Sequence, residues 1–99
     1  MNIKKKESET MTIFSLTGTL DTNTAPQLEE VLIPEFEKVK HIELDFSELE
    51  YVSSAGLRVL LMGTNTAEAK DSKFEISGVS EEIMEIFEMT GFSDILTII

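Results

Sequence analysis

Apolar and charged side chains alternate along residues 41–46 of the chain, HIELDF, where the apolar positions are Ile42, Leu44 and Phe46. Successive side chains of a β-strand point to opposite faces, so this pattern predicts a strand with one buried face and one solvated face. A strand that is covered on both faces reads instead as a continuous apolar run. The alternation therefore predicts that helices cover mainly one side of the sheet.

Three other segments predict strands from their β-branched and aromatic residues, namely 11–18, 73–77 and 95–99. The first of these strands leads into a turn at Gly18. The polar segment 3–9 precedes it and either pairs as an edge strand or stays loose.

Apolar residues recur with the period of an α-helix in three segments. The first helix follows Thr24, which forms a capping-box pattern with Gln27. Pro26 fits the first turn of this helix, where a missing N–H costs nothing, and Pro34 disfavours its last turn. The apolar stripe consists of Leu28, Val31, Leu32 and Phe36.

The second helix follows Ser53 and Ser54, and its stripe consists of Leu57, Leu60, Leu61, Thr64 and Ala67. The third helix begins at Ser80 as N-cap and ends at Gly91. Its first turn carries two acidic side chains, Glu81 and Glu82, whose interaction with the positive end of the helix dipole is favourable. Its buried residues are expected to be Ile83, Met84, Ile86, Phe87 and Met89.

These elements follow one another in the order β-β-α-β-α-β-α-β. Alternation of strands and helices favours parallel strands joined by right-handed crossovers. We therefore expect an α/β fold with a single mixed, largely parallel sheet of four to five strands and helices mainly on one face. A chain of 99 residues fits one domain, spanning 1–99.

Charge and composition narrow the classes of function. The chain has 19 acidic and 8 basic residues, a net charge of −11, so electrostatic repulsion argues against direct binding of nucleic acid or of anionic membranes. No apolar run approaches the roughly 20 residues that span a bilayer, and no leader peptide is recognised. The absence of cysteine is compatible with a reducing compartment. We expect a soluble protein in the cytoplasm.

Residues with catalytic chemistry are scarce. His41 is the single histidine, and its most economical interpretation is a solvated or packed side chain. The usual nucleophile-elbow, phosphate-loop and dinucleotide motifs are missing. Asp45, Glu48 and Glu50 lack the alternating spacing and central glycine of a calcium loop. We therefore expect no enzyme activity, no metal site and no cofactor.

The segment SSAG, residues 53–56, permits two interpretations. Ser53 suits the N-cap position, and Ala55 and Gly56 are small enough for the helix start to pack closely on the sheet. Gly56 costs roughly 0.5–1 kcal/mol relative to alanine in a helix, which indicates close approach by another group. Ser54 would lie where free N–H groups and the helix dipole favour a phosphate. The serine is thus either part of a cap or a site of modification.

Three segments and their spacing resemble the STAS family, in particular bacterial anti-sigma factor antagonists, from about residue 13 to residue 98. They are FSLTGTLDTNTAPQLEEVL, HIELDFSELEYVSSAGLRVLL and FEISGVSEEIMEIFEMTGF, of which YVSSAGLRVLL is the most specific part. The resemblance implies a partner-switching regulator of transcription. Its serine, here Ser54 with Ser53 as second choice, is phosphorylated by an anti-sigma factor that is itself a serine kinase. The resemblance implies that the unphosphorylated protein binds this anti-sigma factor, that phosphorylation breaks the complex, and that a serine phosphatase resets the protein for binding.

The resemblance also implies a partner-binding surface at Ser54 and in the loop of Asp21, Asn23 and Thr24. Their neighbours Ser53, Ala55 and Gly56 at the helix start are assigned to the same surface, and so is Arg58, whose alternative is a solvated surface cation. Asp21 has a second interpretation as a turn residue after Gly18. The position before the phosphoacceptor is often aspartate in the family, whereas this chain has Ser53. Many members also have a final helix, whereas this chain stops at Ile99.

Two alternative functions stay open from the sequence. One is a non-switching STAS scaffold or transporter-accessory subunit. The other is a small acidic carrier protein, whose fold would be all-helical. The protein itself is expected to be a monomer or a weak dimer.

Overall fold

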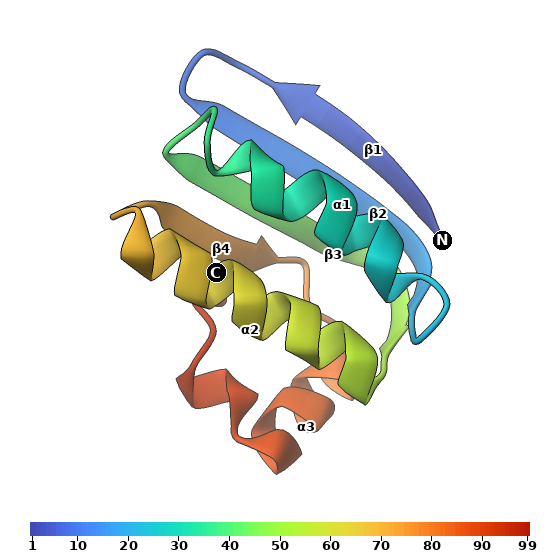
Figure 1. Cartoon of the computed structure of the whole chain (residues 1–99). Helices are drawn as coiled ribbons and strands as arrows, with labels where there is room; N and C mark the ends of the chain where they lie inside the picture. Colours follow the sequence, from blue (N-terminus) through green and yellow to red (C-terminus); the bar gives the residue numbers. More distant parts are fainter.

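The computed structural model describes all residues from 1 to 99 and contains one four-stranded sheet (Figure 1). The elements are, in chain order, β1 (Asn2–Glu7), β2 (Met11–Leu20), α1 (Ala25–Glu35), β3 (His41–Val52), α2 (Ser54–Ala69), β4 (Lys73–Ser77), α3 (Glu81–Thr90) and the 3-10 helix η1 (Phe92–Asp94). Strand order in the sheet is β1-β2-β3-β4, with β1 antiparallel to β2 and the other neighbours parallel. The predicted fold class is confirmed.

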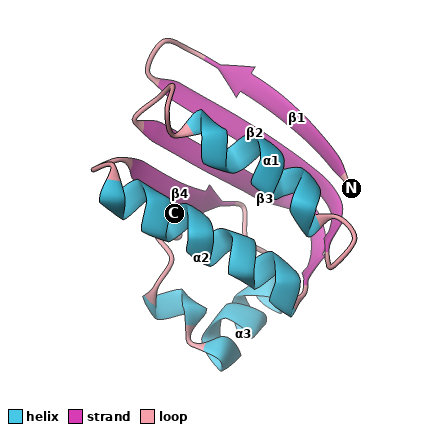
Figure 2. Cartoon of the chain, in the orientation of Figure 1, coloured by secondary structure: helices cyan, strands magenta, loops and turns pink.

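The helices lie over one face of the sheet and leave the other face bare (Figures 1 and 2). This arrangement follows from the strand order, because both crossovers step in the same direction, from β2 to β3 and from β3 to β4. Right-handed crossovers that never reverse place successive helices on the same side. None of the helices combines the length and the apolar character needed to cross a membrane.

The core lies between the sheet and the helices. Phe46 on β3 packs against Phe87 on α3 with ring centroids 6.5 Å apart, and Phe36 meets Phe74 edge to face at 5.7 Å. Most residues of the predicted stripes are buried or half-buried, but two predictions are wrong. Val31 is 39% exposed and Met89 is 85% exposed.

The C-terminal segment 95–99 does not form the predicted strand. After the left-handed turn at Gly91, the chain passes through η1 and reaches β4 only at its end. A single parallel bridge joins Ile98 to Ile76, whose N–H donates to the Thr97 carbonyl and whose carbonyl accepts from the Ile99 N–H. The predicted strand is thus reduced to one rung on the outer edge of β4.

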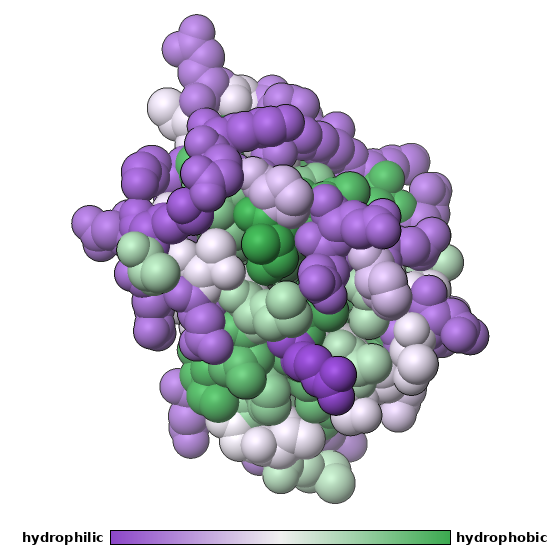
Figure 3. Space-filling model, in the orientation of Figure 1, coloured by the Kyte–Doolittle hydropathy of each residue, from purple (hydrophilic) through white to green (hydrophobic).

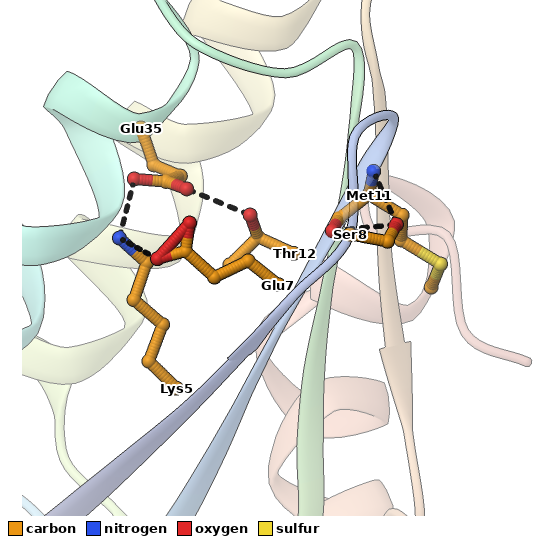
Figure 4. Close-up of polar contacts among 6 residues, drawn as sticks. All are labelled: Lys5, Glu7, Ser8, Met11, Thr12 and Glu35. Carbon is orange, nitrogen blue, oxygen red and sulfur yellow. Dashed lines mark hydrogen bonds and ion pairs between the residues drawn. The ribbon is translucent and has the colours of Figure 1, made fainter.

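The N-terminal segment forms the edge strand β1, and an ion pair connects it to helix α1 (Figure 4). The Nζ of Lys5 lies 3.0 Å from Oε1 of Glu35, a carboxylate that is only 3% exposed. The hydroxyl of Thr12 donates to Oε2 of Glu35 at 2.7 Å. Burial raises the pKa of Glu35, but the hydrogen bonds from Thr12 and Lys5 outweigh burial and leave this pKa below its ordinary value.

We predict that Thr12→Val lowers the free energy of unfolding by about 2 kcal/mol, because a buried carboxylate then loses a strong donor while the volume is unchanged. Urea denaturation at neutral pH measures this change. Thr17→Val on the exposed side of β2 is the matched control and should change stability little. Equal effects of the two substitutions would contradict the role of the Glu35 network.

The same network predicts a dependence on pH. The pKa of Glu35 is lowered by folding, so its contribution to stability is present above the unfolded pKa. That contribution is lost as the pH falls below the ordinary pKa of a glutamate and through the lowered pKa of Glu35 in the folded protein. Without the Thr12 hydroxyl the pKa of Glu35 rises, so acid unfolding of Thr12→Val should begin at a higher pH than in the wild type. Acid unfolding of both proteins at the same pH would contradict a contribution of the Thr12–Glu35 hydrogen bond.

Candidate functional site

The carboxyl ends of β2 and β3 meet at one edge of the sheet, because these two strands are parallel. The loop of residues 21–24 follows β2, and Ser53 and Ser54 follow β3. The N–H of Ser53 donates to the carbonyl of Leu20 at 2.8 Å, which ties the start of α2 to the end of β2. The structure thus brings together the two segments that the sequence singled out, although they are about thirty residues apart.

Ser53 is the N-cap of α2, as predicted from the sequence. Its backbone is extended (φ −90°, ψ 177°), and its hydroxyl accepts a hydrogen bond from the N–H of Gly56 at 3.4 Å. Its carbonyl accepts from the Leu57 N–H at 2.9 Å. Ser54 is the first residue of the helix and is exposed. The two hydroxyls therefore differ, since that of Ser53 is used by the helix and that of Ser54 is presented to solvent.

Gly56 is buried against the end of β2. A Cβ at this position would lie 2.7 Å from Cγ of Leu20 and 2.9 Å from the Leu20 carbonyl oxygen. The close approach that the sequence indicated is therefore made by the protein itself. Gly56 acts by letting α2 sit directly on β2, and half-buried Ala55 lies beside it. This contact fixes the place of the Ser54 hydroxyl.

The loop after β2 is held by Asp21. Its Oδ1 accepts hydrogen bonds from the N–H groups of Asn23 at 2.9 Å and Thr24 at 3.1 Å, and its Oδ2 accepts from the Thr19 hydroxyl at 3.2 Å. The bond from the Thr24 backbone is the main cause that holds the pKa of Asp21 below its ordinary value. Asp21 thus has the turn-forming role considered from the sequence, and its carboxylate stays ionised.

Thr24 does not form the predicted capping box with Gln27. Its backbone is already helical, and its side chain makes no capping hydrogen bond. The Thr24 hydroxyl instead donates to the Thr19 carbonyl at 2.8 Å and accepts from the Asp21 N–H at 2.8 Å. This hydroxyl closes the loop, and Asn23 is left exposed at its tip.

Arg58 lies one turn beyond Ser54 and is exposed. None of the ion pairs of the chain involves this side chain. Tyr51, three residues before Ser54, is 51% exposed at the end of β3 and was not singled out from the sequence. The sequence feature that could have indicated it is a large aromatic residue next to the two serines, in the segment YVSSAGLRVLL.

The other candidate residues lie away from this edge. The ring of His41 contacts the carboxylate of Glu75 at the opposite end of β3. The carboxylate of Asp45 accepts hydrogen bonds from the Ser47 N–H at 3.0 Å and the Ser15 hydroxyl at 3.3 Å. The bond from the Ser47 backbone is the main cause that lowers the pKa of Asp45. Both side chains therefore have structural partners within the sheet.

Comparison with known proteins gives consistent results. A model of the STAS domain matches residues 2–99. The anti-sigma-B factor antagonist of Listeria monocytogenes serovar 1/2a is 32% identical over 101 residues, which cover 99% of this chain and 86% of that protein. Two solved structures of the anti-sigma factor antagonist SpoIIAA share the fold. The unphosphorylated form has a TM-score of 0.78 at 16% identity, covering 99% of this chain and 87% of the other. The phosphorylated form from Bacillus has a TM-score of 0.78 at 17% identity, covering 99% and 91%.

The family is shown by two of these findings together. The family model spans nearly every residue of the chain, and the identity to the Listeria protein extends over the same length. The sequence segments that suggested the family carry the two parts of the candidate site, the Asp21 loop and the start of α2. The chain therefore belongs to the STAS domain family.

Proposed function

We infer that the protein is an anti-sigma factor antagonist that acts as one domain, residues 1–99, by switching between bound and free states in the bacterial cytoplasm. Its partner is an anti-sigma factor with serine kinase activity, which phosphorylates Ser54, and a serine phosphatase reverses the modification. The observation that carries this proposal is the exposed Ser54 hydroxyl at the start of α2, beside a Ser53 hydroxyl that is already used as the cap. The names of the relatives support it.

The surface around Ser54 is suited to contact another protein. It combines the hydrogen-bonded loop of residues 21–24 with the exposed side of the first two turns of α2, which carries Arg58 and no acidic residue. In a chain of net charge −11 such a surface is unusual. Figure 3 shows patches of apolar surface on the helix-covered side of the molecule, with hydrophilic side chains around and between them. A partner can therefore dock here without meeting the acidic excess of the chain.

Phosphorylation would change this surface without disturbing the fold. A phosphate adds about −1.5 to −2 charges and three acceptor oxygens. The start of a helix tolerates negative charge, because its free N–H groups and its dipole point toward it. The added charge would lie in the middle of the proposed contact surface, where the partner has to approach closely. We therefore expect the domain to stay folded and the complex to dissociate.

Ser54→Ala tests the assignment of the phosphoacceptor. We expect this variant to bind the kinase within a few-fold of wild-type affinity and to accept no phosphate, because the cap at Ser53 is intact. Incubation with the kinase and ATP, followed by intact-mass measurement, detects the gain of about 80 Da on the wild type.

Ser53→Ala is the matched control. It should lose about 1 kcal/mol of stability with the cap and still be phosphorylated. Phosphate on Ser54→Ala but not on Ser53→Ala would move the assignment to Ser53. A wild-type protein that binds the anti-sigma factor but is never phosphorylated would favour the non-switching scaffold. The four-stranded sheet is itself incompatible with the all-helical carrier protein.

A further inference from the structure

The bare face of the sheet carries a patch that no part of the proposed switch uses. Side chains that point to this face from β1, β2 and β3 are set by the strand registers, in which Lys6 pairs with Ile13 and Lys4 pairs with Ser15 on β2. Ile13 and Ser15 pair in turn with Glu43 and Asp45 on β3. We define the bare-face patch by six residues, Lys4, Lys6, Met11, Ile13, Glu43 and Asp45.

Charge is arranged across this patch in strips. β1 contributes two exposed lysines, Lys4 and Lys6, which take part in none of the ion pairs of the chain. β3 contributes two carboxylates, Glu43 and Asp45, which accept hydrogen bonds from hydroxyl groups and from one backbone N–H. The two lysines balance the two carboxylates, so the patch is neutral although the chain has a net charge of −11.

Apolar side chains occupy the strand between the two charged strips. Met11 and Ile13 of β2 point to the bare face and are half-buried. A shallow hollow of about 160 Å³ lies beside them, lined by Lys6, Glu7, Ser8, Met11 and Ile13. The centre of the patch therefore offers apolar contact and room for a side chain.

The order basic, apolar, acidic is self-complementary. A two-fold axis that runs parallel to β2, between two facing sheets, places β1 of one copy over β3 of the other and keeps each residue at its height along the strand. Lys6 then faces Glu43 of the second copy, and Lys4 faces Asp45. Met11 and Ile13 meet their own counterparts near the axis. In an isologous contact of this kind, the lysines of each copy face the carboxylates of the other, so the same set of ion pairs forms at two places.

We propose that the bare face of the sheet is the interface of a homodimer, in which three strands of each copy stack face to face. Charge complementarity selects a second copy of this chain as the occupant, since the patch matches itself and is neutral. Sheets that pack in this way lie about 10 Å apart and interdigitate their side chains. Ser54 and the Asp21 loop stay free in the dimer, because α1 and α2 cover the opposite face. The dimer would present two switch sites to its partners.

Charge reversal across the interface tests the proposal. Lys6→Glu alone places like charges together twice in a homodimer, and so does Glu43→Lys alone. Each variant should raise the dimer dissociation constant roughly tenfold or more, measured by sedimentation velocity at about 0.15 M salt. An equimolar mixture of the two variants restores opposite charges at both places. The mixture should recover a dimer of wild-type affinity.

Matched controls and a second variant keep the test decisive. Lys38→Glu and Glu30→Lys make the same charge changes at exposed positions outside the patch and should leave the dimer unchanged. Ile13→Glu, at the axis, should give a monomer whose circular dichroism shows a folded protein. A wild-type protein that stays monomeric up to about 1 mM would overturn the proposal. It would also be overturned by a mixture that stays monomeric or by controls that weaken the dimer equally.

Discussion

Replacing Ser54 with aspartate is expected to weaken binding of the anti-sigma factor kinase roughly a hundredfold or more. The substitution places a permanent negative charge at the centre of the proposed contact surface, where the partner would have to desolvate it. The domain itself should stay folded, because an acidic side chain in the first turn of α2 is favourable toward the helix dipole. Titration of the variant with the kinase, by calorimetry or fluorescence anisotropy, measures the change in affinity.

Asn65→Asp supplies the control for this experiment. Asn65 is exposed on the same helix about three turns from Ser54, so the substitution adds the same charge at a distance from the site. Its affinity for the kinase should stay within a few-fold of the wild type. Wild-type affinity of Ser54→Asp would contradict the proposed surface, and equal losses in both variants would indicate an effect of net charge alone.

Gly56→Ala is expected to lower the free energy of unfolding by about 2–3 kcal/mol. Alanine is the better helix former by about 1 kcal/mol, so propensity alone predicts the opposite sign. The added Cβ would lie 2.9 Å from the Leu20 carbonyl oxygen, which cannot retreat without weakening its hydrogen bond from Ser53. Urea denaturation gives the change in stability, and reduced phosphorylation of Ser54 would report the displaced helix.

Gly91→Ala separates this clash from backbone strain. Gly91 has a φ of +82°, and a Cβ added there would have no atom from elsewhere in the fold within 4 Å, so alanine meets strain but no overlap. That substitution should cost only about 1 kcal/mol and leave phosphorylation of Ser54 unchanged. A Gly56→Ala variant as stable as the wild type would show that β2 and α2 separate easily at this contact.

Local chemistry made part of this structure predictable from sequence. Ser53, Ser80 and Gly91 were recognised because a cap depends on a side chain or a backbone angle within a few residues of itself. The strand that begins at His41 was recognised because its first six residues alternate strictly. The position of Ser54 at the start of a helix followed from the same local signals.

Contacts between distant segments decided the features that the sequence did not reveal. Thr24 has the sequence of a cap, but its hydroxyl is taken by the Thr19 carbonyl on the preceding strand. From the sequence, Glu35 has the character of a surface residue of α1, and its burial depends on its partners Lys5 on β1 and Thr12 on β2. The periodicity of apolar residues within α1 gives no information about partners on other elements.

Strand β3 is longer than the alternating pattern predicts, because register shifts against β2 interrupt the alternation. The strand runs to Val52, six residues beyond the alternating stretch. Register shifts against β2 occur between Ser15 and Thr17 and between Gly18 and Thr19. They turn Leu49 and Val52 toward the core at a spacing of three, which a search for period two does not find. The end of this strand is what carries the chain to Ser54.

The order of strands in the sheet has a consequence for how the chain folds. Each new strand is laid beside the one that precedes it in sequence, from β1 through β4. Each strand therefore pairs first with a strand that has already been synthesised. Pairing can advance from the N-terminus while the ribosome is still adding residues. We expect the loop of residues 21–24 to form early during synthesis. The start of α2 then completes the candidate site once β3 has paired with β2.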